Sequence, residues 1–486
     1  MSRKNGGIIG PANTPVGGIV AGAAGGVWRM NDVANFVNNS QWPKVPENID
    51  NSLRFDDGSS DYLNRTPSSA GNRQTCTFSA WIKRSDIVNA NIVGCHSADN
   101  DNDTINIIVR SNGELRIVAN SLNWRVLSGL FRDVSAWYHI VVAFDTTQST
   151  ANDRIKVYIN GTQETSFSTT NNPDQNANIG FNQASTTRIG VQGNSLSNYF
   201  DGYMAEVVFI DGQQLDPTSF GEFDTTTGIW KPKKIGQIAN AGDNSFYLDF
   251  KDSSNVGKDA SGLSNNFTVN NLTSIDQSTD TCVENYDTLI PLMAGTSSLT
   301  YSEGNLKIVF GASSTWYFTT STIGVTQGKW YCEVKIDAVG GETSVGIIPM
   351  ETVAAQQNAA SDYMGKESDS IGYVNNGQLY KTNSVQETTS SYTTNDIIGI
   401  AFNLDGNSIQ FYKNGSSVGS AITLTSGLTY AVGVSGYNSS TQSVNFGTPS
   451  FSISSGNSDA NGHGNFEYSV PSGYYALNTS NLNTYG

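Results

Sequence analysis

The sequence predicts an all-β protein with two tandem β-sandwiches after an extended, glycine-rich N-terminal arm. The first observation is a repeated hairpin signal, in which an apolar strand precedes a strand ending in Asn-Gly, at residues 140–161 and again at 396–419. Asn and Gly tolerate the positive φ angles of a two-residue type I′ turn, so both stretches predict tight antiparallel hairpins. The second observation is composition. With 49 Gly and only 14% charged residues, the chain suits short strands joined by polar turns.

Length, charge and cysteine content exclude several classes of protein. A chain of 486 residues exceeds one hydrophobic core, so two large domains are expected. The net charge of −16 leaves no basic stripe for phosphates, and no apolar run approaches the ~18 residues that span a bilayer. We therefore expect neither nucleic-acid binding nor membrane insertion. The four cysteines form no CxxC pair, which favours free, mostly buried thiols over a Cys76–Cys95 disulfide.

Residues 1–48 are expected to form the arm. Pro11, Pro15 and the many glycines before residue 27 argue against a signal-peptide helix. Such a segment buries too little surface to fold alone. Trp28, Phe36 and Trp42 are its expected attachment residues, and two interpretations stay open: they dock on a partner protein, or they cap the first sandwich.

Residues 49–232 are expected to form the first sandwich. Strand signals recur there at short intervals without a helical pattern. In the stretch 76–83, Phe78, Ala80 and Ile82 share one face, while Thr77, Ser79 and Trp81 share the other.

Residues 233–291 are expected to form a connector with short strands that pack on the domains, because a structureless link of this length is unusual. Residues 292–486 are expected to form the second sandwich. In it, Trp330, Val334 and Ile336 alternate with Tyr331, Glu333 and Lys335, which predicts a strand from packing alone.

The chain lacks the patterns of common enzyme sites. Retaining glycosidases need two carboxyls about 5 Å apart, but Glu206 and Asp211 are five positions apart on a strand and should lie on opposite faces. His139 lies in an apolar strand and is expected to be a hydrogen-bonded structural residue. We therefore expect no enzymatic activity.

Two weaker signals concern ligands. Asp99, Asp101 and Asp103 alternate as in calcium loops, but Thr104 and Arg110 replace the turn glycine and the last ligand, so an exposed polar loop is the main expectation. Glycan binding needs exposed aromatic rings beside amides and carboxylates. The aromatic residues near expected loops are Tyr62, Trp124, Tyr199 and Tyr437.

Three motifs of the first sandwich resemble the laminin-G-like branch of the concanavalin A-like jelly rolls. They are Phe-Ser-Ala-Trp-Ile-Lys at 78–83, the run from Trp137 to Asp145 with Val-Tyr-Ile-Asn-Gly at 157–161, and Phe-Asp-Gly-Tyr-Met-Ala-Glu-Val-Val-Phe-Ile-Asp at 200–211. The resemblance implies a jelly-roll sandwich. It also implies that calcium at a sheet rim, here at Asp99, Asp101 and Asp103, is an alternative to the polar loop.

The second sandwich resembles the SPRY family, which is also concanavalin A-like. The motifs follow the family's order: Gly-Lys-Trp-Tyr-Cys-Glu-Val at 328–334, Asp-Ser-Ile-Gly-Tyr at 369–373, the hairpin at 396–419, Val-Asn-Phe-Gly-Thr-Pro at 444–449 and Pro-Ser-Gly-Tyr-Tyr-Ala-Leu-Asn at 471–478.

The whole arrangement of arm, laminin-G-like sandwich, connector and SPRY sandwich resembles virion structural proteins of tailed bacteriophages, especially marine ones. The resemblance implies a virion appendage or fibre protein, assembled in the host cytoplasm. Its arm would attach to other virion proteins of the capsid, tail or portal region, and its sandwiches would contact host-surface polysaccharide. A secreted or cell-surface adhesin is the alternative, and a glycan-cleaving enzyme is disfavoured. Homo-oligomerisation stays open.

Overall fold

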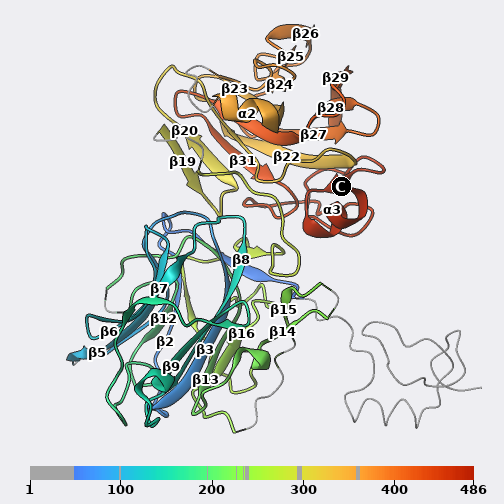
Figure 1. Cartoon of the computed structure of the whole chain (residues 1–486). Helices are drawn as coiled ribbons and strands as arrows, with labels where there is room; N and C mark the ends of the chain where they lie inside the picture. The colour runs from blue at the N-terminus through green and yellow to red at the C-terminus, as the bar shows by residue number, and fades with distance from the viewer. Residues whose placement is uncertain are drawn as a thin grey trace, which may run out of the picture. The chain divides into compact units, whose positions relative to one another are not determined.

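The computed structural model describes residues 49–97, 100–193, 195–225, 227–233, 235, 240–292, 298–356 and 362–486 (Figure 1). These residues form an all-β protein with two antiparallel β-sandwiches, as the sequence predicts. The arm, with Trp28, Phe36 and Trp42, lies outside the described residues. Within the described residues, no helix is both long and apolar enough to cross a membrane.

The first sandwich has two main sheets. Sheet 1 has the order β10-β9-β8-β3-β13-β1-β18, and β16 also pairs with β13; sheet 2 has the order β11-β7-β6-β5-β4-β12-β2-β17. The strands of sheet 1 are β1 (Ser52–Phe55), β3 (Thr75–Arg84), β8 (Trp137–Asp145), β9 (Ile155–Ile159), β10 (Thr162–Gln163), β13 (Gly202–Asp211), β16 (Phe246–Leu248) and β18 (Gln277–Ser278). Those of sheet 2 are β2 (Tyr62–Arg65), β4 (Ala90–Ser97), β5 (Asn100–Val109), β6 (Glu114–Ala119), β7 (Leu122–Leu130), β11 (Phe167–Thr170), β12 (Thr187–Ile189) and β17 (Thr268–Asn270).

Smaller elements complete this part of the chain. Strands β14 (Gly221–Phe223) and β15 (Trp230–Pro232) form a separate pair, and two 3₁₀ helices span Ala151–Arg154 and Pro217–Ser219. The expected connector contributes β16, β17 and β18 to the edges of the two main sheets. Its short strands therefore pack on the first sandwich, because they complete the hydrogen bonding of strands that would otherwise be exposed edges.

The core of the first sandwich follows from strand alternation. Phe78, Ala80 and Ile82 of β3 lie in one buried cluster with Ile105 and Ile107 of β5 in the other sheet. Trp81, on the opposite face of β3, packs in a separate cluster with Trp230. Both faces of this central strand are thus covered, and the predicted alternation of residues 76–83 is confirmed.

The second sandwich also has two sheets. Sheet 3 has the order β19-β20-β31-β22-β27-β28-β29, with β32 beside β22, and sheet 4 has the order β21-β30-β23-β24-β25-β26. The strands of sheet 3 are β19 (Leu299–Ser302), β20 (Lys307–Phe310), β22 (Lys329–Ala338), β27 (Ile397–Asn403), β28 (Ser408–Lys413), β29 (Ser416–Thr423), β31 (Thr441–Asn445) and β32 (Tyr475–Ala476). Those of sheet 4 are β21 (Tyr317–Thr320), β23 (Thr343–Pro349), β24 (Ile371–Val374), β25 (Gln378–Lys381), β26 (Ser384–Thr388) and β30 (Tyr430–Gly436).

Two short helices accompany these sheets, α2 (Met350–Gln356) and α3 (Thr479–Tyr485). Trp330, Val334 and Ile336 of β22 point into the core with Val345 and Ile347 of β23, as the alternation predicts.

Both predicted Asn-Gly hairpins are confirmed. Asn160 and Gly161, between β9 and β10, have φ angles of 47° and 79°. Asn414 and Gly415, between β28 and β29, have φ angles of 50° and 79°. Both residues of each turn are left-handed, which is the backbone that a type I′ turn requires.

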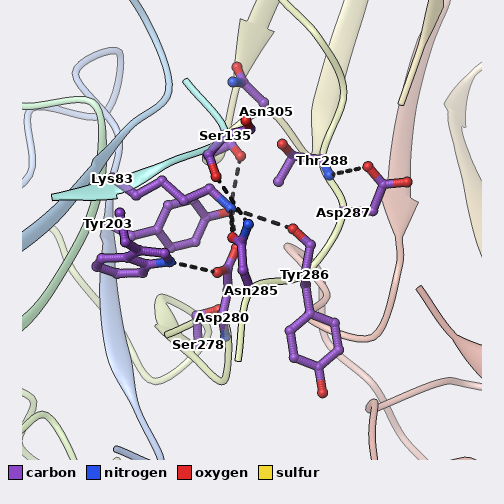
Figure 2. A network of polar contacts seen from close by, with 12 residues as sticks. Lys83, Ser135, Tyr203, Ser278, Asp280, Asn285, Tyr286, Asp287, Thr288 and Asn305 are labelled. Carbon is purple, nitrogen blue, oxygen red and sulfur yellow. Dashed lines mark hydrogen bonds and ion pairs between the residues drawn. The ribbon is translucent and has the colours of Figure 1, made fainter. Parts of the chain in front are cut away.

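A buried polar network ties β3 to the segment that follows β18 (Figure 2). Lys83 Nζ lies 2.7 Å from Asp280 Oδ2 and donates to Asn285 Oδ1 at 2.7 Å. The indole of Trp137 donates to Asp280 Oδ1 at 3.2 Å, and Asn285 donates to the carbonyl oxygen of Ser135 at 3.0 Å. The Lys83 and Asp280 side chains are 2% and 0% exposed, so this ion pair lies fully inside the protein.

Candidate functional site: an aromatic patch on the second sandwich

Four half-exposed aromatic side chains meet on the outer face of sheet 4. Trp316 precedes β21, Tyr363 lies between α2 and β24, Tyr380 belongs to β25, and Tyr437 follows β30. We call these four residues the aromatic patch. Leu379 lies in the core, and its neighbour Tyr380 therefore points to the other side of β25.

The rings of the patch form a connected series. The ring centroid of Trp316 lies 5.0 Å from that of Tyr437 and 5.3 Å from that of Tyr363, and the Tyr363 centroid lies 5.5 Å from that of Tyr380. These separations are typical of edge-to-face and tilted aromatic pairs. The rings therefore support one another and form one connected aromatic cluster whose members are each half-exposed.

Glycines make room for two of these rings. A Cβ atom on Gly341 would lie 2.2 Å from the Tyr437 ring, and one on Gly365, whose φ is +96°, would lie 2.6 Å from Tyr380 Cβ. Side chains at these positions would displace the rings, so the backbone fixes their placement.

Polar groups border the patch. The Tyr363 hydroxyl donates to Asn383 Oδ1 at 2.9 Å, the Tyr380 hydroxyl donates to Gln378 Oε1 at 2.9 Å, and the Tyr437 hydroxyl donates to Glu342 Oε2 at 3.4 Å.

Desolvation raises the pKa of Tyr363 and of Tyr437, and the negative charge of Glu342 adds to both shifts. These two phenols therefore stay neutral near pH 7. Neutral ring faces beside hydroxyl, amide and carboxylate groups suit the stacking and hydrogen bonding of a sugar.

The four predicted glycan-contact residues lie in three different environments in the structure. Tyr437 belongs to the aromatic patch. Tyr62 and Tyr199 are half-exposed and form a pair on the first sandwich, with ring centroids 6.3 Å apart. Trp124 lies in β7 and is only 8% exposed within the first core, so its predicted exposure is wrong. Asn120 and Ser121 form a tight left-handed turn, with φ angles of 51° and 65°, and β7 therefore begins before Trp124.

Sequence reasoning missed Trp316, Tyr363 and Tyr380. The alternation of buried Leu379 with Tyr380 was a usable signal for an outward ring. The other two positions depend on loops whose course sequence periodicity does not reveal.

The predicted aspartate site lies partly outside the described residues. Asp99 lies outside the described residues, and Asp101 and Asp103 belong to strand β5 rather than to a loop. A metal site at these three residues stays a prediction.

His139 is placed as a structural residue. The indole of Trp230 donates to its Nδ1 at 3.0 Å, so the ring proton is on Nε2, which lies 2.9 Å from Ser79 Oγ. Burial lowers the pKa of His139 to about 3, which keeps the ring neutral. Because Ser79 accepts the His139 proton in this arrangement, the histidine does not activate the serine as a nucleophile.

Glu206 and Asp211 do not form a carboxylate pair. The Glu206 carboxylate accepts a hydrogen bond from the Tyr247 hydroxyl at 2.5 Å, whereas Asp211 accepts from the main-chain N–H of Asn72 at 2.8 Å. Tyr247 packs in the cluster outside β13, with Val208 and Ile210. The two carboxylates thus serve as hydrogen-bond acceptors on different sides of the strand.

The four cysteines are free thiols in the structure. Cys76, Cys95 and Cys332 are buried and Cys282 is half-buried. The predicted burial of most of them is confirmed.

Family comparisons identify two domains. A family model described as the concanavalin A-like lectin/glucanases superfamily, of the laminin-G type, matches residues 57–216. A SPRY domain model matches residues 329–449. The chain thus contains a laminin-G-like domain and a SPRY domain, and these domain types suggest a binding or adhesin-like role.

Several solved structures resemble part of the chain. The SPRY domain of human HERC1 is 20% identical, with 32% of this chain and 96% of that chain covered, at a TM-score of 0.27. The stonustoxin structure is 16% identical, with 33% and 27% covered, and the TRIM65 PSpry domain is 13% identical, with 33% and 89% covered; both have TM-scores of 0.27. No curated protein matches the chain. The aromatic patch is therefore the feature of this chain that indicates a ligand.

Proposed function

We propose that this chain is a non-enzymatic binding protein whose aromatic patch contacts carbohydrate. The observation that carries the proposal is the connected series of half-exposed rings at Trp316, Tyr363, Tyr380 and Tyr437, bordered by amide and carboxylate groups. Sugar contacts with a shallow patch of this kind gain little binding free energy beyond the entropy that is lost when the sugar and the side chains become ordered. Each site should therefore bind with a Kd of roughly 0.1–1 mM. Many copies on one particle would provide the attachment strength.

The biological setting is the second part of the proposal. The resemblance of the domain arrangement to virion proteins of tailed phages supports a virion appendage, attached through residues 1–48 to other virion proteins and facing host-surface polysaccharide. The alternative is a secreted or cell-surface adhesin, for which the aromatic patch would serve equally well. The two differ in where the protein resides, which mass spectrometry of purified particles determines.

Deleting residues 1–45 should abolish incorporation into particles while both sandwiches stay folded, because the strands of both sandwiches in the described part of the chain begin at Ser52 or later. Quantitative mass spectrometry of particles assembled with full-length or truncated chain measures this. Equal incorporation of the truncated chain would refute the role of the arm, and absence of the full-length chain from particles would favour the adhesin.

Replacing Trp316 with Ala should weaken carbohydrate binding by about tenfold or more, because aromatic residues at the centre of a contact surface dominate binding energy. The measurement is retention of multivalent protein on a glycan array. Tyr199→Ala is the matched control, since it truncates a half-exposed ring on the other sandwich. Loss of retention in the control but not in Trp316→Ala would show that the Tyr62–Tyr199 pair, and not the aromatic patch, contacts the sugar. If the multivalent wild-type protein is retained on none of the polysaccharides, glycan binding is refuted.

A further inference from the structure

A carboxylate lies at the edge of the aromatic patch. Glu342 is placed between β22 and β23, and its Oε2 accepts the Tyr437 hydroxyl proton at 3.4 Å. The face of an aromatic ring is the negative part of its quadrupole, so a cation over that face is attracted to the ring. Half-exposed rings beside a carboxylate therefore favour a positively charged ligand group over a neutral or a negative one.

The charge of Glu342 acts on two rings of the patch. Desolvation raises the pKa of both Tyr363 and Tyr437, and the Glu342 charge raises both pKa values further. A nearby cation would have the opposite effect on a phenol. The charge that these two rings experience from Glu342 is thus negative, which suits a cationic partner.

The lysines nearest to the patch in sequence are engaged elsewhere. Lys366 Nζ lies 2.5 Å from the carboxylate of Asp362, and Lys381 Nζ donates to the carbonyl oxygen of Thr423 at 2.8 Å. Among the described residues, no lysine or arginine forms an ion pair with Glu342. The charge of this carboxylate is therefore free to act on a ligand.

The phenol hydroxyls of the patch add hydrogen-bond acceptors. Tyr363, Tyr380 and Tyr437 each donate the hydroxyl proton to a side-chain oxygen of a neighbouring residue. A hydroxyl has one proton and two acceptor lone pairs, so these oxygens keep their lone pairs for a ligand. An ammonium group has three N–H donors, no acceptor and a positive charge. It therefore matches this surface better than an uncharged sugar hydroxyl, which supplies one donor.

We propose that the aromatic patch and Glu342 select polysaccharides whose sugars carry a free, positively charged amino group. The selection rests on the proposed function and names the class of sugar that the same surface takes. An N-acetylated sugar lacks the charge and two of the three donors, and Glu342 would repel an acidic sugar. The net charge of −16 also attracts a cationic polymer to the rest of the chain, so variants must separate the patch from this general attraction.

Isothermal titration calorimetry of the full chain compares two oligosaccharides of equal length, a glucosamine oligomer and its N-acetylated counterpart. Below the pKa of the sugar amine, the Kd of the amino form should be lower by about fivefold or more, because a cation over aromatic rings and an exposed ion pair each add modest affinity. A uronic acid oligomer should bind more weakly than either. Equal Kd values for the amino and acetylated forms, or tighter binding of the uronic acid oligomer, would overturn the proposed selection.

Two variants assign the preference to the patch. Glu342→Gln keeps an acceptor for the Tyr437 hydroxyl and removes the charge, so it should reduce the ratio of the two Kd values by about threefold. Glu164→Gln makes the same change at a half-exposed residue that follows β10 of the first sandwich, and it should leave the ratio unchanged. An unchanged ratio in Glu342→Gln, or an equal fall in both variants, would overturn the assignment to the patch.

Retention on other polysaccharides separates this selection from the proposed function. If neither oligomer binds although the multivalent protein is retained on another polysaccharide, the selection of amino sugars is overturned and carbohydrate binding stands. If the multivalent protein is retained on no polysaccharide, including those with free amino groups, both proposals are refuted.

Discussion

Replacing Lys83 with Met should destabilise the protein by about 3–5 kcal/mol, because it leaves the Asp280 carboxylate buried without its cation. Asp280 is 0% exposed, and its ion pair with Lys83 measures 2.7 Å. The same substitution removes the donor to Asn285 Oδ1 (Figure 2). Urea unfolding followed by tryptophan fluorescence measures the loss.

Two further variants identify the cause. In Lys83→Met/Asp280→Asn, most of the stability should return, since no charge stays buried and the amide oxygen can still accept from Trp137. Lys231→Met removes a half-exposed partner of Asp224 and should cost less than about 1 kcal/mol. Equal losses for Lys83→Met and Lys231→Met would show that the buried ion pair is unimportant.

The cost of Lys83→Met should also depend on pH. Burial raises the pKa of Asp280, and the charge of Lys83 partly offsets this effect. When the folded pKa lies above the unfolded one, a carboxyl loses its stabilising contribution as pH rises through the folded pKa. Removing Lys83 raises the folded pKa further. The variant should therefore lose more stability relative to wild type at about pH 8 than at about pH 5, both above the unfolded pKa of Asp.

Gly202→Ala should cost more than about 3 kcal/mol, the second large effect we expect, because two penalties combine. Gly202 begins β13 with a φ of +139°, a conformation that L-residues rarely adopt. A Cβ atom there would lie 2.1 Å from the carbonyl oxygen of Lys83, so β13 would have to move away from β3.

Gly212→Ala is the matched control for Gly202→Ala. Gly212 follows the same strand, has a φ of +86° and has no atom within 4 Å of the position of a Cβ. It should carry only the backbone penalty, about 1–2 kcal/mol. The difference between the two variants in urea unfolding gives the combined cost of the clash and of the more extreme φ angle at Gly202. Similar losses at both positions would mean that β13 shifts easily and that the clash with Lys83 is not a constraint.

Local sequence signals predict much of the fold. Asn160-Gly161 and Asn414-Gly415 form the expected turns, and the alternation of Phe78, Ala80 and Ile82 places their side chains in the core. These features depend on φ preferences and on the two-residue period of a strand, which are properties of neighbouring residues. Asn120-Ser121 shows the limit of this approach. These two residues also form a left-handed turn, but Asn-Ser is a less specific turn sequence than Asn-Gly. The strand that follows it and buries Trp124 was therefore not predicted.

The candidate binding site depends on long-range pairing. Trp316, Tyr363, Tyr380 and Tyr437 come from four segments of sheet 4 and its loops, and only Tyr437 was predicted as a contact residue. The carboxylates of Asp56 and Asp201 likewise lie close together only because β1 pairs with β13, and neither segment alone encodes that pairing. A single sequence gives residue types and local periodicity, whereas sheet register determines which side chains share a site.

Fluorine NMR on fluorotryptophan-labelled chain tests the central claim most directly, because it reports which aromatic side chains a sugar contacts. The chain has 8 tryptophans, and the resonance of Trp316 is assigned by its absence in Trp316→Phe. On addition of a polysaccharide that the multivalent protein retains, the Trp316 resonance should shift, while that of Trp330, which is 0% exposed, should not. An unmoved Trp316 resonance at saturating polysaccharide would contradict carbohydrate binding at the aromatic patch.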